Sequence, residues 1–404
     1  MARMRYIVHA GNHARRHCPV WVKGAGLDPA RDYVVVSAES KAALPAQAVE
    51  TADGVRLVWL LPALAAGASE TFTLEEGAHG SMDSRPVSRA GQASRESDGP
   101  VTVADGRYGL DVHLGGELFT TYHHAARHNK QFLYPVIGPT GSGMTRGYPM
   151  VQDIPGEKHD HPHHKSIHVA HGDVNGVDLW SELDAHGYQR HAAFAPAFGA
   201  GSAYVSGPVC GAFRSRSRWV SRNEQPVVTE EKQVVVYAPA PHARLLDIAV
   251  TLHATEGPVR FGDTKEGAML SVRVASSMDA DAGGEIENAY GGRGEDECFG
   301  HRAQWMDYVG PVDGTTVGLA VFDHPTSFRY PTYWHVRNYG LMHANCFAWR
   351  EFLGHPGVDG SYVLPEGARL RCTFRVYLHT GNTQDAGVKE RYHDFITPPV
   401  VEVV

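Results

Sequence analysis

Histidine is concentrated in one short segment of the chain. Of the 25 histidines in 404 residues, four lie in the run His159-Asp-His-Pro-His-His164. Pro162 excludes a regular helix here, so we expect an extended or looping backbone. In an extended chain His161 and His163 share one face, and His164 points to the other. Imidazole titrates near neutral pH and binds metal ions, so this spacing indicates proton transfer or metal ligation.

Two chemistries follow from this run, and both stay open. In the first, His163 or His164 acts as a general acid on a substrate. In the second, His161 and His163 bind a divalent metal ion together with a distant third ligand such as His335. A structural role, in which an imidazole hydrogen-bonds a loop carbonyl, competes with both for any single histidine.

Aromatic and turn-forming polar residues follow the histidine run. Trp180 offers an indole face on which a sugar ring can stack, and Asp173 and Asn175 can bind hydroxyl groups. A hairpin loop with a core tryptophan is the alternative, because Asp and Asn also stabilise turns.

A second cluster places a cation beside a carboxylate. Lys265 and Glu266 would point to opposite faces of a regular strand, so only a bulge or turn at Gly267 would aim both at one pocket. Glu266 is our candidate general base, because burial and a cationic neighbour can tune the pKa of a carboxyl group. A surface ion pair is the alternative.

A third cluster lies in residues 333–345, where aromatic side chains alternate with hydrogen-bonding ones. Such a set is typical of a polyol site. Lys265 and His335 would polarise a substrate oxygen, whereas a structural network is the better explanation for His343. The expected catalytic residues are His163, His164, Lys265, Glu266 and His335. The expected substrate-binding residues are Arg146, His161, Asp173, Asn175, Trp180, Trp334, Arg337 and Asn345.

Short β-branched runs separated by turn residues must position these clusters. The chain has 44 glycines and 24 prolines, and several apolar runs alternate with polar residues, which indicates antiparallel sheets with one solvated face. The sequence shows no alternation of strands and helices, and this argues against a Rossmann or TIM fold. One helix is predicted, over residues 384–395, with a cap at Asn382 or Thr383 and a stop at residues 397–399.

The composition of residues 86–100 divides the chain into two modules. This segment is almost free of apolar residues and is predicted to be a linker. We therefore expect an N-terminal β module over residues 1–85 and a β-supersandwich over residues 101–397. The first module would shape one rim of the site or mediate dimerisation.

Composition and charge exclude several classes of protein. The net charge of −8 argues against nucleic acid as a partner, and the longest apolar run, residues 55–66, is interrupted by Arg56 and Pro62. The N-terminus lacks the apolar core of a secretory signal, so we expect a cytoplasmic protein. Its five cysteines are scattered and form no C-x-x-C pair, which indicates reduced thiols.

Several motifs resemble a known family over about residues 101–380. They are Tyr148-Pro149-Met150, His159-Asp-His-Pro-His-His164, His171-Gly-Asp-Val-Asn-Gly-Val-Asp-Leu-Trp180, Phe261-Gly-Asp-Thr-Lys-Glu-Gly267, Arg302-Ala-Gln-Trp-Met-Asp-Tyr308, Asp323-His-Pro325 and Pro331-Thr-Tyr-Trp-His-Val-Arg-Asn-Tyr-Gly340. Together they resemble the PmoA-like family of bacterial proteins, whose label "methane oxygenase" comes from a membrane subunit. The resemblance implies a β-supersandwich of the galactose mutarotase type and a role in sugar catabolism.

Three functions are compatible with these observations. The first is an enzyme that performs acid–base chemistry on a sugar, keto-sugar or glycoside, by epimerisation, elimination–hydration or glycoside cleavage. The second is a metal-dependent enzyme, such as an oxygenase, with His161, His163 and His335 as ligands; a divalent metal is the one candidate cofactor. The third is a sugar-binding protein without catalytic activity. All three require the three clusters to meet in one cavity.

Overall fold

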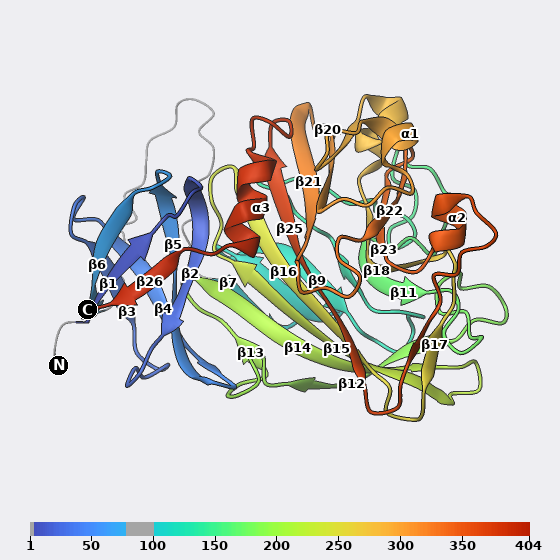
Figure 1. Cartoon of the computed structure of the whole chain (residues 1–404), viewed down its shortest axis with the longest axis horizontal. Helices are drawn as coiled ribbons and strands as arrows, with labels where there is room; N and C mark the ends of the chain where they lie inside the picture. Colours follow the sequence, from blue (N-terminus) through green and yellow to red (C-terminus); the bar gives the residue numbers. More distant parts are fainter. Residues whose placement is uncertain (1–3, 78–100) are drawn as a thin grey trace.

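The chain folds into antiparallel sheets, and its helices are short. The computed structural model describes residues 4–77 and 101–404, so the predicted linker, residues 86–100, lies outside the described residues. Figure 1 shows a smaller β module beside a larger one. The predicted all-β chain, an antiparallel supersandwich with a small N-terminal β module, is confirmed.

A seven-stranded antiparallel sheet forms the N-terminal module. Its strands, in spatial order, are β2 (Arg15–Lys23), β5 (Gly54–Leu64), β4 (Ala43–Thr51), β3 (Tyr33–Ser37), β6 (Ser69–Glu76), β1 (Arg5–His9) and β26 (Val400–Val403). The sheet buries a cluster of its own that includes Tyr6, Trp59 and Phe72. Its last strand comes from the far end of the chain, because β26 pairs with β1 from Tyr6 to His9.

Two larger sheets form the supersandwich. The first contains, in spatial order, β22 (Tyr333–Arg337), β23 (Leu341–Asn345), β18 (Gly267–Arg273), β11 (Ile167–His171), β10 (Phe132–Tyr134), β9 (Glu117–His123), β8 (Leu110–Leu114) and β7 (Val101–Asp105). The second contains β12 (Tyr188–Ala195), β14 (Cys210–Val220), β15 (Pro226–Tyr237), β16 (Ala243–His253), β25 (Arg369–Thr380), β21 (Thr315–Asp323), β20 (Trp305–Val312) and β19 (Glu285–Asn288), with β13 (Tyr204–Val205) paired to β14. A separate pair consists of β17 (Val259–Phe261) and β24 (Tyr362–Leu364).

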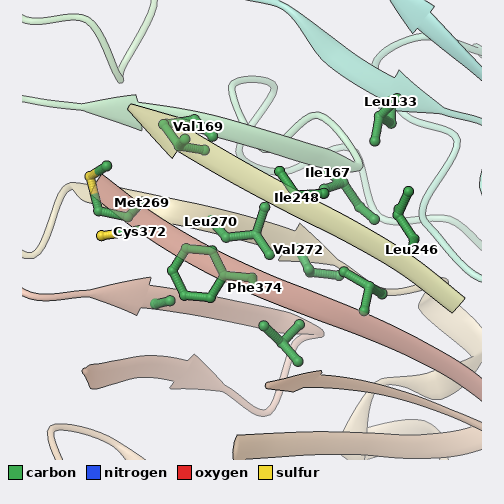
Figure 2. Close-up of a cluster of buried hydrophobic side chains, with 14 of the residues drawn as sticks. Leu133, Ile167, Val169, Leu246, Ile248, Met269, Leu270, Val272, Cys372 and Phe374 are labelled. Carbon is green, nitrogen blue, oxygen red and sulfur yellow. The ribbon is translucent and has the colours of Figure 1, made fainter. Parts of the chain in front are cut away.

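The hydrophobic core lies between these two sheets. Figure 2 shows Ile167 and Val169 of β11 and Leu270 and Val272 of β18 facing β16 and β25. On each strand these apolar residues alternate with residues that face away from the core, as the period of two along a strand requires. The outward residues of β11, β18, β23 and β22 are the polar ones on which the candidate site is built.

Three short helices complete the fold. They are α1 (Gly294–Cys298), α2 (Trp349–Leu353) and α3 (Val388–Ile396), and two 3-10 turns span Ser276–Met278 and Ala280–Ala282. Among the described residues, none of the helices has the length and apolar character that crossing a membrane would need.

The predicted C-terminal helix begins later than expected. Asn382 accepts a hydrogen bond from the backbone of Asp385, as a cap would, but Gly387 adopts φ of 63° and separates this turn from α3. The predicted stop at Thr397 is correct. Helix α3 packs against β2 and β21, so it covers the junction between the two modules.

Candidate functional site

Strands β11, β18, β23 and β22 are neighbours in the first large sheet (Figure 1), and a row of polar side chains crosses them. His168 of β11 lies opposite Ser271 of β18, Ser271 lies opposite His343 of β23, and His343 lies opposite His335 of β22. Residues directly opposite in antiparallel strands point to the same side of a sheet. The four side chains therefore form one line on the face that turns away from the core.

A bulge in β18 makes this alignment possible. The pairing with β11 shifts between His168 and Ala170, and Met269 and Leu270 both lie in the core. The extra residue returns Ser271 and Arg273 to the outer face. In a regular strand continuing from Ala268, which packs against Trp180, Leu270 would point outward and Ser271 would point into the core. Bulges of this kind commonly re-aim side chains beside functional sites.

The row is buried, and several of its polar atoms have no hydrogen-bond partner. His343 is fully buried, and both of its ring nitrogens lack a partner among the described residues. The same holds for Oγ of Ser271, Nε2 of His168 and Nε1 of Trp180. A buried polar group without a partner costs about 1–3 kcal/mol, and such groups are rare in native proteins. These five atoms lie together on one face, which makes this face the candidate site.

The predicted histidine run and Trp180 cover the row. The ring of Trp180 lies 4.8 Å from that of His343 and 5.4 Å from that of His168, between centroids. His164 lies 5.4 Å from His343 and 4.8 Å from His161, on which it stacks. His335 continues the series at 5.3 Å from His343. The clusters near residues 160 and 335 therefore meet, as the sequence analysis required.

Two arginines fix the histidine run above the sheet. Arg146 is fully buried and donates to the carbonyl oxygen of His161 at 2.9 Å and to the carboxylate of Asp160. Arg273 of β18 donates to the same carboxylate at 3.1 Å. Burial acts to raise the pKa of Asp160, but the two guanidinium groups outweigh it, so the pKa is lowered. Arg146, predicted to hold a substrate, thus acts on the loop instead.

Hydrogen bonds set the proton positions on three rings. Arg273 donates to Nδ1 of His164 at 3.3 Å, and because a guanidinium only donates, neutral His164 carries its proton on Nε2. Nδ1 of His168 donates to the carbonyl of Lys165 at 3.2 Å, which leaves Nε2 as an acceptor. In His335, Nδ1 donates to the carbonyl of Lys265 and Nε2 accepts from Arg337.

Burial keeps these imidazoles neutral at pH 7. It lowers the pKa of His164, His168 and His343 well below the ordinary value. Burial, with Lys130 as the next contribution, lowers the pKa of His163 to about 4. A general acid at His163 or His164, as predicted, would therefore have to act from the neutral imidazole at pH 7. The rings act as neutral donors and acceptors.

A buried lysine ties the histidine run to Trp180. Nζ of Lys130 donates to the carbonyl of Trp180 at 2.7 Å and to that of His163 at 3.1 Å. Glu182 lies 3.2 Å from the same ammonium and 2.8 Å from Nζ of Lys165. Burial lowers the pKa of Lys130 to about 8, although Glu182 opposes the shift. These contacts make Lys130 a positioning residue.

The exposed rim of the face includes Glu266 and Lys265. Glu266 is exposed just before β18, and its charge acts on Tyr339, whose ring stacks on His161 at 5.0 Å. Gly172 donates to the carbonyl of Glu266 at 2.7 Å, and a Cβ at Gly172 would lie 2.6 Å from that oxygen, so only glycine permits this approach. Lys265 points elsewhere, because its Nζ pairs with Glu351 at 2.6 Å.

Arg337 and Asn345 support the rim rather than leave it open for a ligand. Arg337 pairs with Glu295 of α1 at 2.6 Å and packs over the ring of Phe299. Asn345 is buried, and its side-chain amide donates to the carbonyl of Thr264 at 3.0 Å.

Three predicted substrate-binding residues lie outside the site. Trp334 neighbours His335 on β22, so it faces the core and donates to the carbonyl of Ala303. Asp173 pairs with Arg260 at 2.9 Å and accepts from the backbone of Gly176, and Asn175 accepts from the backbone of Arg260. The prediction that these residues bind a sugar is wrong for Trp334, and the other two stabilise a turn.

The predicted metal ligands do not converge. Both ring nitrogens of His335 are engaged, and the rings of His161 and His163 lie 5.8 Å apart at a steep angle. Within residues 4–77 and 101–404, no group of three or more His, Cys, Asp or Glu side chains is arranged to hold a metal ion.

Sequence reasoning missed several residues of the site. Ser271 and Arg273 alternate with Leu270 and Val272, so their outward direction could have been predicted from the period of two. Lys130 gave no signal, because a single lysine in a mixed segment is most often solvated.

Comparison with solved structures finds weakly similar proteins, including two from Enterococcus faecalis. One is a glycosyl hydrolase family 38 protein from Enterococcus faecalis, with a TM-score of 0.41 and 9% identity, aligned over 100% of this chain and 47% of that one. The other is an alpha-mannosidase from Enterococcus faecalis V583, with a TM-score of 0.41 and 8% identity, aligned over 100% and 46%. The chain thus spans about half of the length of each.

Sequence comparison identifies the family. No curated protein matches the chain significantly. A sequence profile of a family described as "Family of unknown function (DUF6807)" matches residues 109–393, which include every strand of the polar row. The chain therefore belongs to the DUF6807 family.

Proposed function

We propose that the outer face of β11, β18, β23 and β22 binds a sugar or keto-sugar and transfers a proton to or from it. The observation that carries this proposal is the buried row from His168 to His335 with its unpartnered nitrogens and hydroxyl. Hydroxyl groups of a sugar both donate and accept hydrogen bonds, so they match a row in which donors and acceptors alternate.

Neutral imidazoles suit chemistry at a carbonyl group. His164 would donate a hydrogen bond from Nε2 to the carbonyl oxygen of a keto-sugar, and Glu266 would remove a proton from the neighbouring carbon. The electron pair of the C–H bond then enters the new carbon–carbon double bond, and the oxygen takes the negative charge. A neutral imidazole stabilises such an oxyanion without being protonated first. Return of the proton to the former carbonyl carbon, together with transfer of the neighbouring hydroxyl proton to the first oxygen, forms the new carbonyl group and completes an isomerisation.

Two further observations support this proposal. The rings of His161 and Tyr339, which are not buried, offer flat surfaces beside the polar row. The resemblance of residues 101–380 to the PmoA-like family, with its expected role in sugar catabolism, is part of the same proposal.

Deuterium exchange tests the proposal directly. A 3-keto-glucoside and a panel of aldoses and ketoses are incubated with the protein in D₂O, and loss of C–H signals is followed by proton NMR. We expect exchange next to the carbonyl with wild type. Because general acid–base groups contribute about 10²–10⁴-fold, Glu266→Gln should reduce the rate by about that factor. His164→Ala should also slow it.

A matched control separates the site from histidine content in general. His113 lies on the same sheet at β8, three strands away from β11, and His113→Ala should leave the exchange rate unchanged. Saturable binding of a saccharide without exchange would instead identify a sugar-binding protein. Exchange that Glu266→Gln leaves intact would contradict the role of this carboxylate.

A further inference from the structure

A second cavity lies at the junction of the two modules, away from the polar row. Its volume is about 470 Å³, within the usual range for small-molecule sites. Strand β2, the turn between β15 and β16, strand β25 and the approach to α3 each contribute to its wall. Cavities between modules are common ligand sites, because side chains from several segments converge there.

Two cationic or protonatable side chains at this cavity are available to a ligand. Arg16 is exposed on β2, and its guanidinium makes no ion pair with any residue in the described part of the chain. His242, in the turn after β15, is exposed as well. Arg391 also lines the cavity, but it pairs with Asp394 at 2.8 Å and holds the carbonyl of Arg16 at 3.2 Å.

His17 lines the cavity, and its backbone is strained. Its φ of 48° is in the left-handed region, which costs a residue other than glycine about 1–3 kcal/mol. The conformation lets Nε2 donate across the junction to the carbonyl of Ala238 at 2.9 Å. Strain of this kind concentrates at ligand sites.

The charges around His17 favour an anion. Burial lowers the pKa of His17 to about 4, and the charged groups that add to this shift are all cations, namely Arg244, Arg375 and Arg391. Asp385 is the one carboxylate among the described residues that line the cavity, and it is exposed at the turn before α3. Arg375 pairs with Asp247 and Arg391 pairs with Asp394, so the positive charge that is left for an anion at this cavity comes from Arg16 and Arg244.

The remaining wall is apolar. Pro62 of β5, Leu245 of β16 and Tyr377 of β25 lie along it, and the last two are buried. The hydroxyl of Tyr377 is engaged by the carbonyl of Ala386, so the ring presents its apolar surface. A ligand that fits has one anionic end and a hydrocarbon body.

We propose that this cavity binds a small monocarboxylate, whose carboxylate group pairs with Arg16 and His242 and whose hydrocarbon part lies against Leu245 and Tyr377. The site is independent of the polar row in the first large sheet. It couples the N-terminal module to the supersandwich, since Arg16 belongs to one and the other three residues belong to the second.

NMR titration of the whole protein with hexanoate tests this proposal. The ring signals of His17 and His242 should shift saturably, and hexanamide, which has the same body without the charge, should give no saturable shift. A hydrogen bond to a charged group contributes about 1.5–3 kcal/mol, which corresponds to about 10–100-fold in affinity. Arg16→Ala should weaken hexanoate binding by that factor.

Two further variants complete the test. Asp385→Asn removes the opposing carboxylate and should tighten binding of hexanoate. His242→Ala provides a second weakened variant, and its exposed position protects the fold. Equal shifts with hexanoate and hexanamide, no saturable shift with either, or unchanged affinity in both Arg16→Ala and His242→Ala would each overturn the proposal.

Discussion

Arg273 donates a hydrogen bond from Nη1 to Nδ1 of His164 across 3.3 Å. The same guanidinium reaches Asp160 at 3.1 Å and stacks over the ring of Tyr339 at 4.8 Å. One fully buried side chain on β18 therefore sets both the position of the histidine run and the proton of its last ring. The strand and the loop are far apart in sequence, and Arg273 joins them.

Replacing Arg273 tests this relationship. In Arg273→Met, His164 loses the donor at Nδ1, so its ring should change from the Nε2–H tautomer to a mixture. Correlation of ¹⁵N and ¹H signals of the imidazole measures this change. Loss of the hydrogen bond to Asp160 should reduce the free energy of unfolding by about 1–3 kcal/mol. Arg107→Met, on the exposed side of the β7–β8 turn, should change neither quantity.

The protein should be more stable with an apolar residue at position 343. Both of its ring nitrogens are buried without a partner, so His343→Leu should raise the free energy of unfolding by about 1–3 kcal/mol, measured in urea. The same variant should abolish proton exchange on keto-sugars. As a control, His171→Leu removes a bond to the carbonyl of Gly262 and should destabilise the protein. A destabilised His343→Leu would contradict our interpretation of the row.

Buried neutral histidines should make the protein unstable in acid. Burial lowers the pKa of His171 and His335 to about 4, whereas the unfolded chain titrates near 6.5. Between these values the unfolded state binds more protons, so stability is full above about pH 6.5 and is lost as the pH falls towards 4. Each group contributes a slope of up to about 1.4 kcal/mol per pH unit. Urea unfolding at pH 7, 6 and 5 measures the free energy of unfolding at each pH. A free energy that does not change with pH would contradict the lowered pKa values of these histidines.

Lys130 should be critical for the loops that cover the polar row. Lys130→Met leaves the carbonyls of His163 and Trp180 without their donor and leaves Lys165 as the one remaining ammonium beside Glu182 among the described residues, so the free energy of unfolding should fall by about 3 kcal/mol. Adding Glu182→Gln should lower it further, because Lys165 then loses its carboxylate. Chemical denaturation of both variants measures the difference. Equal stability of the single and double variants would show that the ion pair is unimportant.

The fold was predictable because strand patterns are local. The short apolar runs and turn residues specify antiparallel strands, and the core residues of β11 and β16 follow the period of two. The helix near the C-terminus was displaced because Gly387 adopts a left-handed conformation, which spacing alone does not reveal.

The site was harder to predict because it depends on strand order. Bringing His164 and His335 near His343 requires β11, β18 and the hairpin of β22 and β23 to be neighbours, and long stretches of chain separate β11, β18 and this hairpin. Trp334, in contrast, is next to His335 on one strand, so its side chain points to the opposite face. The prediction that Trp334 binds the substrate could therefore have been excluded from the sequence. Burial, which decides the protonation of the histidines, is visible only in the folded protein.

The pairing of β26 with β1 also bears on how the chain is assembled during synthesis. Strand β1 keeps one hydrogen-bonding edge unsatisfied until residues 400–403 leave the ribosome, after the strands of the second module have been translated. Exposed strand edges attract other chains, so nascent protein is vulnerable to aggregation for that interval. Truncation of the last strand would make that vulnerability permanent.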